Sequence, residues 1–163
     1  LINKKIAIHI FKVYDNKVNC YYNLEIMSQN IGIIQHVTEM LRKSPLKVTS
    51  QRITLIKLIF ANGDAHYTAE EVFIEAKNQK IKISLATVYN TLNSFRNHGI
   101  LSVVKTTSDK IYFDTNLKDH HHFYCKESGE LKDIKSSNVI ISKMPKIPKG
   151  KKLSSVNVII NIN

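Results

Sequence analysis

The amino-acid sequence predicts an α+β fold, and two observations carry that prediction. Between residues 49 and 99, apolar side chains recur at three- and four-residue steps in three separate stretches, which is the period of helices that bury one face. After residue 99, β-branched residues alternate with polar ones, which is typical of strands. Three helices followed by a β-hairpin are the order of a winged helix-turn-helix, and a second, smaller unit follows it.

The first two helices are marked by their capping residues. Thr49 or Ser50 can cap a helix that ends near Asn62-Gly63. Thr68, with Glu71 three residues on, has the pattern of a capping box. The side chains expected to point into the core are Ile53, Ile56, Leu58, Ile59 and Phe60 in the first helix and Val72, Phe73 and Ala76 in the second.

The third helix, from Ser84 to Gly99, has one apolar and one polar face. We expect the apolar face to be buried; it carries Leu85, Val88, Leu92 and Phe95. The polar face contains no acid and fits the major groove of DNA, where Tyr and Thr contact thymine methyls and Asn pairs with adenine. A solvated helix face is the alternative. With basic residues on neighbouring elements, the predicted DNA-binding set is Arg52, Lys82, Ala86, Thr87, Tyr89, Asn90 and Lys110.

The strands follow Gly99. Ile100–Thr106 and Ile111–Phe113 form the predicted hairpin, with Lys110 at its tip. Further strand-like segments are Phe123–Lys126, Glu130–Ile134 and Val156–Ile162, the last reached through a basic connector at 143–150. The predicted domains are an N-terminal extension of uncertain relevance (1–39, with Met27 and Met40 as possible later starts), a winged-helix DNA-binding domain (40–113) and a second domain (114–163).

Composition limits the classes of function. The chain has 163 residues, 43% of them apolar, and a net charge of +11, with a pI near 9.6. This charge favours nucleic acid as a partner, then an anionic membrane surface, although a basic protein without an acidic partner stays open. Cys20 and Cys125 are too far apart for a paired zinc motif. Since no apolar run is long enough for a bilayer and Leu1–Ile10 lacks a cleavage site, we expect a cytoplasmic protein.

The run Asp119-His120-His121-His122 is the main candidate site. On an extended strand, His120 and His122 project to one side, and His121 and Asp119 to the other. Two imidazoles on one side form half of a divalent metal site, which Asp114, Asp133 and His66 can complete. Such a mixed N/O set suits Fe, Mn or Zn. A surface histidine run is the alternative, and His66 alone is more often a helix-flanking residue.

An ordered series of motifs resembles the ferric uptake regulator (Fur) family. The motifs are Thr49-Ser50-Gln51-Arg52, His66–Val72 and Ser84–Leu92, and the segments 112–116, 119–123 and 145–160 look closest to the iron response regulator Irr of alphaproteobacteria. This resemblance covers about residues 37–163. It implies a winged helix joined to a small α/β dimerisation domain, a homodimer on double-stranded operator DNA, and a metal site bridging the domains at His66, Asp114, His120, His122 and Asp133.

Departures from that family refine the expectation. Ser128 stands where the partner of Cys125 in a Cys-x-x-Cys pair would be, so no structural zinc held by four cysteines is expected. The Irr resemblance associates His120, His121 and His122 with haem sensing. The leading hypothesis is therefore a non-enzymatic transcriptional regulator of iron and haem genes, responding to a divalent metal or haem. A metal- or peroxide-responsive repressor without haem sensing is the alternative; a metal-buffering protein and a small metallohydrolase are more remote.

Overall fold

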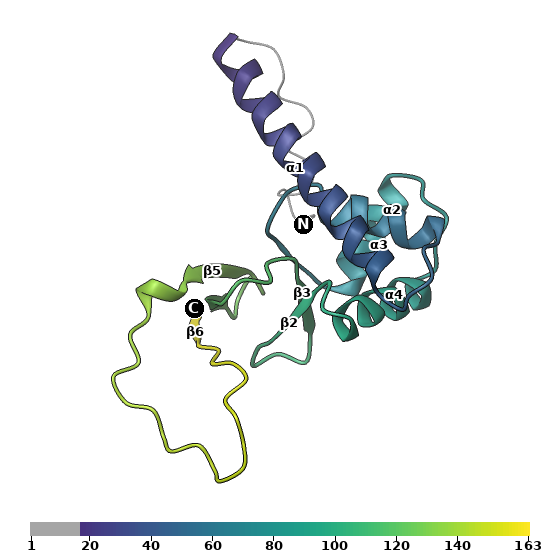
Figure 1. Ribbon diagram of the computed structural model, residues 1–163. Helices are drawn as coiled ribbons and strands as arrows, with labels where there is room; N and C mark the ends of the chain where they lie inside the picture. The colour runs from purple at the N-terminus through teal and green to yellow at the C-terminus, as the bar shows by residue number, and fades with distance from the viewer. Residues whose placement is uncertain (1–16) are drawn as a thin grey trace.

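The computed structural model describes residues 17–163, with side chains from residue 30 onward. It confirms the α+β class (Figure 1). The helices are α1 (Lys17–Lys43), α2 (Ser50–Ile59), α3 (Ala69–Asn78) and α4 (Leu85–Asn97), with a short 3-10 helix at Ser136–Asn138. The strands are β1 (His66–Tyr67), β2 (Ser102–Lys105), β3 (Ile111–Asp114), β4 (His120–Cys125), β5 (Leu131–Lys135) and β6 (Ile159–Ile162).

The caps predicted for the three helices after α1 are confirmed. The Thr49 side chain accepts a hydrogen bond from the backbone N–H of Arg52 at the start of α2. Thr68 and Glu71 form a reciprocal capping box at α3, and Ser84 accepts from the N–H of Thr87 at α4. Because each cap satisfies backbone donors that the first helical turn leaves free, these residues determine where the helices begin.

Helices α1 to α4 and the first strands enclose one apolar core. Val37 and Leu41 of α1 are both buried in this core. Because Val37 precedes residue 40, the core begins before the predicted domain boundary. The other largest fully buried apolar side chains are Leu55, Ile56, Ile59, Val72, Val88, Leu92, Phe95, Ile100 and Phe113. The end of α1 therefore packs with the helical unit, whereas residues 1–16 of the predicted extension lie outside the described residues.

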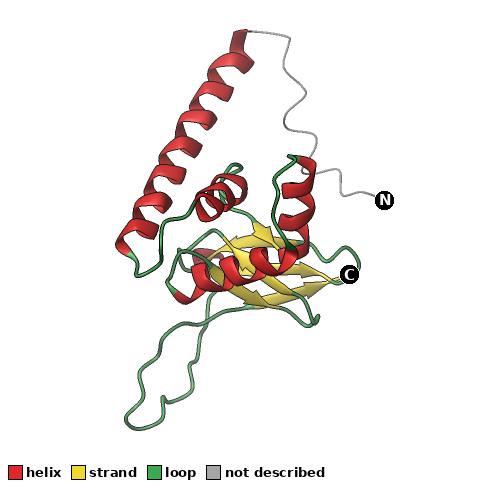
Figure 2. Ribbon diagram, turned by 90° about the vertical axis from the view of Figure 1, so that its right-hand side faces the viewer, coloured by secondary structure: helices red, strands yellow, loops and turns green. Residues whose placement is uncertain are grey.

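Two three-stranded sheets follow from the strand pairing. The first has the order β1-β3-β2, all antiparallel. In the second, of order β5-β4-β6, β4 pairs antiparallel with β5 and parallel with β6. Strand β4 starts at His120 rather than at the predicted Phe123, because His120 already pairs with Lys135 of β5. Figure 1 shows β2 and β3 between α4 and the second sheet, and Figure 2 shows the strands from the side of the helices.

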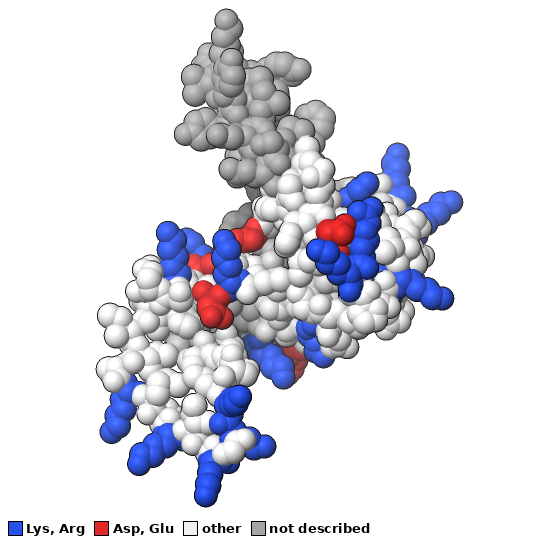
Figure 3. All heavy atoms as spheres, in the orientation of Figure 1, with Lys and Arg blue, Asp and Glu red and all other residues white. Residues whose placement is uncertain are grey.

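The connection between β5 and β6 is long and open. After the 3-10 helix, residues 139–158 contain no helix or strand, and nearly all of them are exposed. Figure 3 shows lysine side chains spread along this part of the surface, at the lower left of the view. Among the described helices, none is long and apolar enough to cross a membrane.

Candidate metal centre

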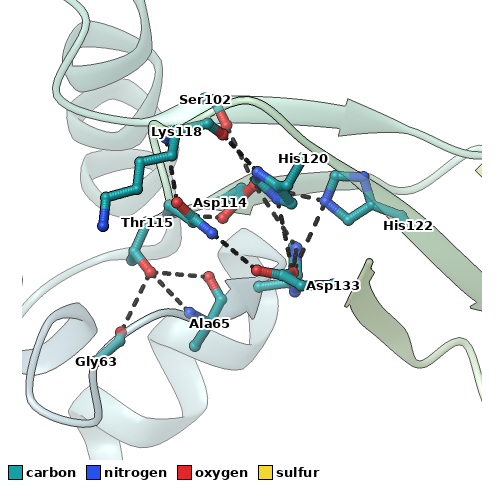
Figure 4. A network of polar contacts seen from close by, with 11 residues as sticks. Gly63, Ala65, Ser102, Asp114, Thr115, Lys118, His120, His122 and Asp133 are labelled. Carbon is teal, nitrogen blue, oxygen red and sulfur yellow. Dashed lines mark hydrogen bonds and ion pairs between the residues drawn. The ribbon is translucent and has the colours of Figure 1, made fainter. Parts of the chain in front are cut away.

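Strand pairing brings the histidines and carboxylates together. In the first sheet, His66 of β1 lies directly opposite Asp114 of β3. In the second, His122 of β4 lies opposite Asp133 of β5. His120 precedes His122 by two residues and therefore projects from the same face of β4. All five predicted ligands meet at the junction of the two sheets. Figure 4 labels Asp114, His120, His122 and Asp133 among them.

The distances within this cluster are short. The Oδ2 atom of Asp114 lies 3.1 Å from Nε2 of His120 and 3.6 Å from Nε2 of both His66 and His122. The Oδ1 atom of Asp133 lies 3.2 Å from His66 Nε2, 3.6 Å from His120 Nε2 and 4.0 Å from His122 Nε2. One possible ligand atom from each of His66, His120, His122 and Asp133 falls within 4.8 Å of the others.

The donor atoms at the centre have no hydrogen-bond partner. Nε2 of His66, His120 and His122 is buried and unpartnered in each case. Leaving such an atom unsatisfied costs about 1–3 kcal/mol, so an arrangement of this kind calls for a ligand. The two carboxylates, Asp114 and Asp133, also bring negative charge to the same place. The residues therefore fit a divalent cation with mixed nitrogen and oxygen ligands.

A backbone contact orients the His120 ring. Its Nδ1 atom lies 2.6 Å from the carbonyl oxygen of Lys118. A carbonyl can only accept, so Nδ1 carries the proton and donates it. In the neutral ring Nε2 then keeps its lone pair, and this pair faces Asp114 and Asp133. This tautomer is the one a metal ligand requires.

Burial and charge shift two groups of the cluster in directions that favour metal binding. Desolvation lowers the pKa of His66 below its ordinary 6.5, although Asp114 and Asp133 partly oppose the shift. Burial alone would raise the pKa of Asp114, but the His122 and His66 imidazoles and the Asn116 backbone N–H outweigh it, and the net pKa is lowered. The imidazole of His66 is therefore neutral and the Asp114 carboxyl ionised at pH 7.

Asn116 supports the cluster, a role that the sequence analysis missed. Its backbone N–H donates to Oδ1 of Asp114 at 2.8 Å, and its side-chain amide donates to Oδ2 of Asp133 at 2.9 Å. Both carboxylates are thus oriented by one residue. Asn116 stands two residues after Asp114 in a motif that the sequence analysis quoted, but nothing in that motif indicates a contact with Asp133, seventeen residues away.

Thr115 supports the cluster from the side of His66, by hydrogen bonds to the loop that precedes β1. Its hydroxyl accepts a hydrogen bond from the backbone N–H of Ala65 at 2.7 Å, and its own N–H donates to the Ala65 carbonyl at 3.1 Å. The hydroxyl also lies 3.2 Å from the carbonyl of Gly63 (Figure 4). These contacts hold the loop before β1 and so fix the position of His66.

His121 and Cys125 lie away from this centre. His121 projects from the opposite face of β4, is 7% exposed, and its Nδ1 accepts a hydrogen bond from the N–H of Val158 at 3.4 Å. Cys125 ends β4 as a free thiol. Hydrogen bonds from Ser128 lower the pKa of the Cys125 thiol.

The predicted DNA-binding face on α4 is largely accessible. Ala86 and Asn90 are exposed, and Thr87 and Tyr89 are half-buried. On the opposite face Leu85 is only half-buried, and Thr91 is buried instead. The Tyr89 hydroxyl donates to Oε1 of Glu70 at 2.5 Å. An acid from α3 therefore lies beside a face that carries no acid of its own.

The basic members of the predicted set lie on separate elements. Lys82 and Lys110 are exposed, before α4 and beside the β2–β3 turn. The Arg52 guanidinium on α2 donates to the backbone carbonyl of Lys47. The structure thus leaves the two lysines available to phosphates and ties one N–H of Arg52 to its own chain.

The sequence as a whole matches a known family. The model of the "Ferric uptake regulator family" matches residues 43–162. The chain belongs to this family. A ferric uptake regulation protein of Haemophilus ducreyi is 32% identical over 105 residues, which is 63% of this chain and 70% of that protein. A peroxide-responsive repressor, PerR, of Staphylococcus aureus is 30% identical over 112 residues, 66% and 75% of the two chains.

Solved structures agree with the family assignment at the level of the fold. A ferric uptake regulator from Pseudomonas aeruginosa, solved with manganese, has a TM-score of 0.60 at 23% identity and covers 75% of this chain and 92% of its own. One from Francisella tularensis, solved with iron, has a TM-score of 0.60 at 24% identity and covers 72% and 91%. Fur-family members are metal-responsive transcriptional regulators, not enzymes, which counts against the metallohydrolase alternative.

Proposed function

We propose that this Fur-family regulator binds a divalent metal at His66, Asp114, His120, His122 and Asp133, and operator DNA through α4. The observation that carries the proposal is the set of unpartnered Nε2 atoms of His66, His120 and His122 facing two carboxylates. Manganese or iron is favoured, since two ferric uptake regulators of similar fold were solved with these metals. Zinc also suits a mixed nitrogen and oxygen set.

The cluster draws on both sheets, which supports a regulatory role. His66 and Asp114 belong to the sheet attached to the helices, whereas His120, His122 and Asp133 belong to the second sheet. A metal that takes ligands from both sheets restrains the angle between the two units. In a homodimer held through residues 114–163, that angle determines the spacing of the two α4 helices and so the affinity for a palindromic operator.

DNA binding is tested with the double variant Tyr89→Ala/Asn90→Ala. We expect wild-type protein with Mn²⁺ to protect specific genomic promoter fragments in a footprint, and the variant to lose that protection, because the base-contacting side chains are gone. The Mn²⁺ affinity of the double variant should equal that of the wild-type protein. Equal protection by both proteins contradicts the assignment of α4 as the recognition helix.

Regulation of iron and haem genes is the finer part of the proposal, and it rests on the Irr resemblance. If His120, His121 and His122 bind haem, titration of the protein with haem gives a Soret band that weakens when all three are changed to Ala. An unchanged Soret band and affinity remove the haem role. The alternative is then a metal- or peroxide-responsive repressor, as the PerR relative is named.

A further inference from the structure

The connection between β5 and β6 carries a basic segment that the proposed function does not use. Residues 143–152, called the lysine arm below, contain Lys143, Lys146, Lys149, Lys151 and Lys152. No acidic residue occurs anywhere from residue 134 to the end of the sequence. All ten residues of the arm are exposed. Within residues 30–163, none of its lysines forms an ion pair with an acidic side chain.

The sequence of the arm favours an extended backbone with regularly spaced charges. Pro145 and Pro148 fix their own φ angles and disfavour helical geometry at the residues before them. In a polyproline-like conformation three residues make one turn, which would put lysines three apart on the same edge, about 9 Å from each other. Lys143, Lys146 and Lys149 have this spacing. A turn closed by the Lys151 N–H and the Pro148 carbonyl then adds Lys151 and Lys152.

The spacing allows contact with a nucleic-acid backbone. Phosphates on one DNA strand are about 3.4 Å apart along the axis, so several lysines about 9 Å apart can each approach a phosphate. Anionic lipid headgroups would attract the same lysines, but the chain belongs to a family of transcriptional regulators, and this favours DNA. Met144 and Ile147, also three residues apart, share another edge in that conformation and are 44% and 49% exposed, so binding to anionic vesicles is a separate part of the test below.

The position of the arm also favours DNA. Residues 153–158 link the arm to β6, whose Asn161 accepts a hydrogen bond at 3.4 Å from Thr107, beside the turn that carries Lys110. In Figures 1 and 2 the connection that includes the arm extends from the lower side of the molecule, and in Figure 1 the β2–β3 hairpin points the same way.

We infer that the lysine arm binds the phosphate backbone of the DNA next to the sequence that α4 contacts. The inference rests on the proposed DNA binding and adds a second contact, from the second unit of the chain. Since phosphate contacts carry no sequence information, the arm raises affinity for all duplexes equally and leaves the preference between sequences unchanged.

The test is the salt dependence of binding to a mixed-sequence duplex of about 40 base pairs, long enough to extend beyond one α4 contact. Binding is measured by fluorescence anisotropy with the full chain and Mn²⁺. In the arm variant, Lys143, Lys146, Lys149, Lys151 and Lys152 are changed to Gln. Each phosphate contact contributes about −0.9 to the slope of log affinity against log salt, so we expect the slope to become shallower by about 3 to 4. Affinity at about 0.1 M salt should fall roughly tenfold or more.

The matched control removes the same charge elsewhere. Its five exposed lysines, also changed to Gln, are Lys43, Lys57, Lys77, Lys126 and Lys132. This variant should keep most of the wild-type slope. A further variant, Pro145→Gly/Pro148→Gly, keeps every charge and should lose less affinity than the arm variant, because only the spacing is disturbed.

The outcomes separate the arm from the proposed function. If the wild-type chain binds no duplex under any condition, the DNA-binding function itself fails. If it binds, and the arm variant has the wild-type slope or changes no more than the control, the arm assignment is overturned. It is also overturned if the arm variant keeps its DNA affinity but loses binding to vesicles of phosphatidylglycerol, which would assign the arm to anionic lipid.

Discussion

The two units of the chain meet at two neighbouring contacts of opposite chemistry. One is the metal centre, in which buried Nε2 atoms of three histidines face two carboxylates without hydrogen bonds. The other is an apolar patch, formed by Val104 and Tyr112 of the β2–β3 hairpin with Tyr124, Leu131 and Ile159 of the second sheet. The patch is closed by the Tyr112 hydroxyl, which donates to the Gly129 carbonyl at 3.0 Å.

The difference between the two contacts is whether their stability depends on a bound ligand. In the proposed metal centre the donors are satisfied only by a bound cation, so we expect its contribution to stability to depend on metal and pH. The patch buries apolar surface and completes its hydrogen bond within the chain, so it needs no ligand. Tyr112 stays a donor over the whole physiological range, because burial and the neighbouring Tyr124 raise its pKa to about 12.

The largest expected effect is the loss of metal binding in His122→Ala. Since loss of a residue that hydrogen-bonds to a metal ligand already costs roughly 10–100-fold in affinity, removing a direct ligand should weaken Mn²⁺ binding by roughly 100-fold or more. The rise in melting temperature on adding Mn²⁺ should disappear with it. His36→Ala, an exposed position on α1, is the control. A full thermal shift in His122→Ala would exclude this imidazole as a ligand.

Asn116→Ala should come next. Without its amide, Asp133 loses its orienting hydrogen bond, and we expect Mn²⁺ affinity to fall roughly 10–100-fold. The partly exposed Asn116 adds little apolar burial, so the melting temperature of the metal-free protein should change little. Isothermal titration calorimetry and metal-free melting curves separate the two effects. A large fall in metal-free stability at unchanged affinity would mean that Asn116 acts only on the fold.

Acidification should distinguish the two contacts. The folded-state pKa of His66 is lowered, so the unfolded chain binds the proton more readily, and His66 stabilises the fold less as pH falls below its ordinary 6.5. The lowered pKa of Asp114 adds a further loss only below its ordinary value of 3.8. Protons also compete with the metal for imidazole. Mn²⁺ affinity measured at about pH 7.5, 6.5 and 5.5, which spans the ordinary imidazole range, should therefore decline, and a flat profile would contradict the imidazole ligands.

The smallest expected effect is at the patch. Tyr112→Phe removes the hydrogen bond to Gly129 and leaves the ring, which should lower the free energy of unfolding by about 1 kcal/mol. The loss should be the same with and without Mn²⁺, as chemical denaturation can measure. If the effect depends on metal, the two contacts are coupled, and a double-mutant cycle with His122→Ala gives the coupling energy.

The sequence was most informative where structure is local. Thr49, Thr68 and Ser84 begin their helices as predicted, because a cap bonds to a backbone N–H only three residues away. The alternation of β4 also placed His120 and His122 on one face, since side-chain direction in a strand depends on residue parity alone. The five candidate ligands follow from that alternation together with the resemblance to the family.

Contacts between residues far apart in the chain could not be predicted from the sequence pattern. Strand β1 is two residues long, and it exists because His66 and Tyr67 pair with β3, far along the chain. The Asn116–Asp133 and Tyr89–Glu70 hydrogen bonds likewise join separate elements. The predicted domain boundary at residue 40 relied on the weak pattern before Thr49, yet Val37 packs in the core of the helical unit.

The parallel pairing of β6 with β4 has a consequence for the order of folding. β4 and β5 are joined by a short turn, so pairing His122 with Asp133 closes only a short loop. Pairing β6 with β4 closes the longer loop of residues 136–158, and loop closure costs entropy that rises with length. We therefore expect Ile159 to join the apolar patch after the β4–β5 hairpin has formed, whereas Val104, Tyr112 and Tyr124 can pack without β6.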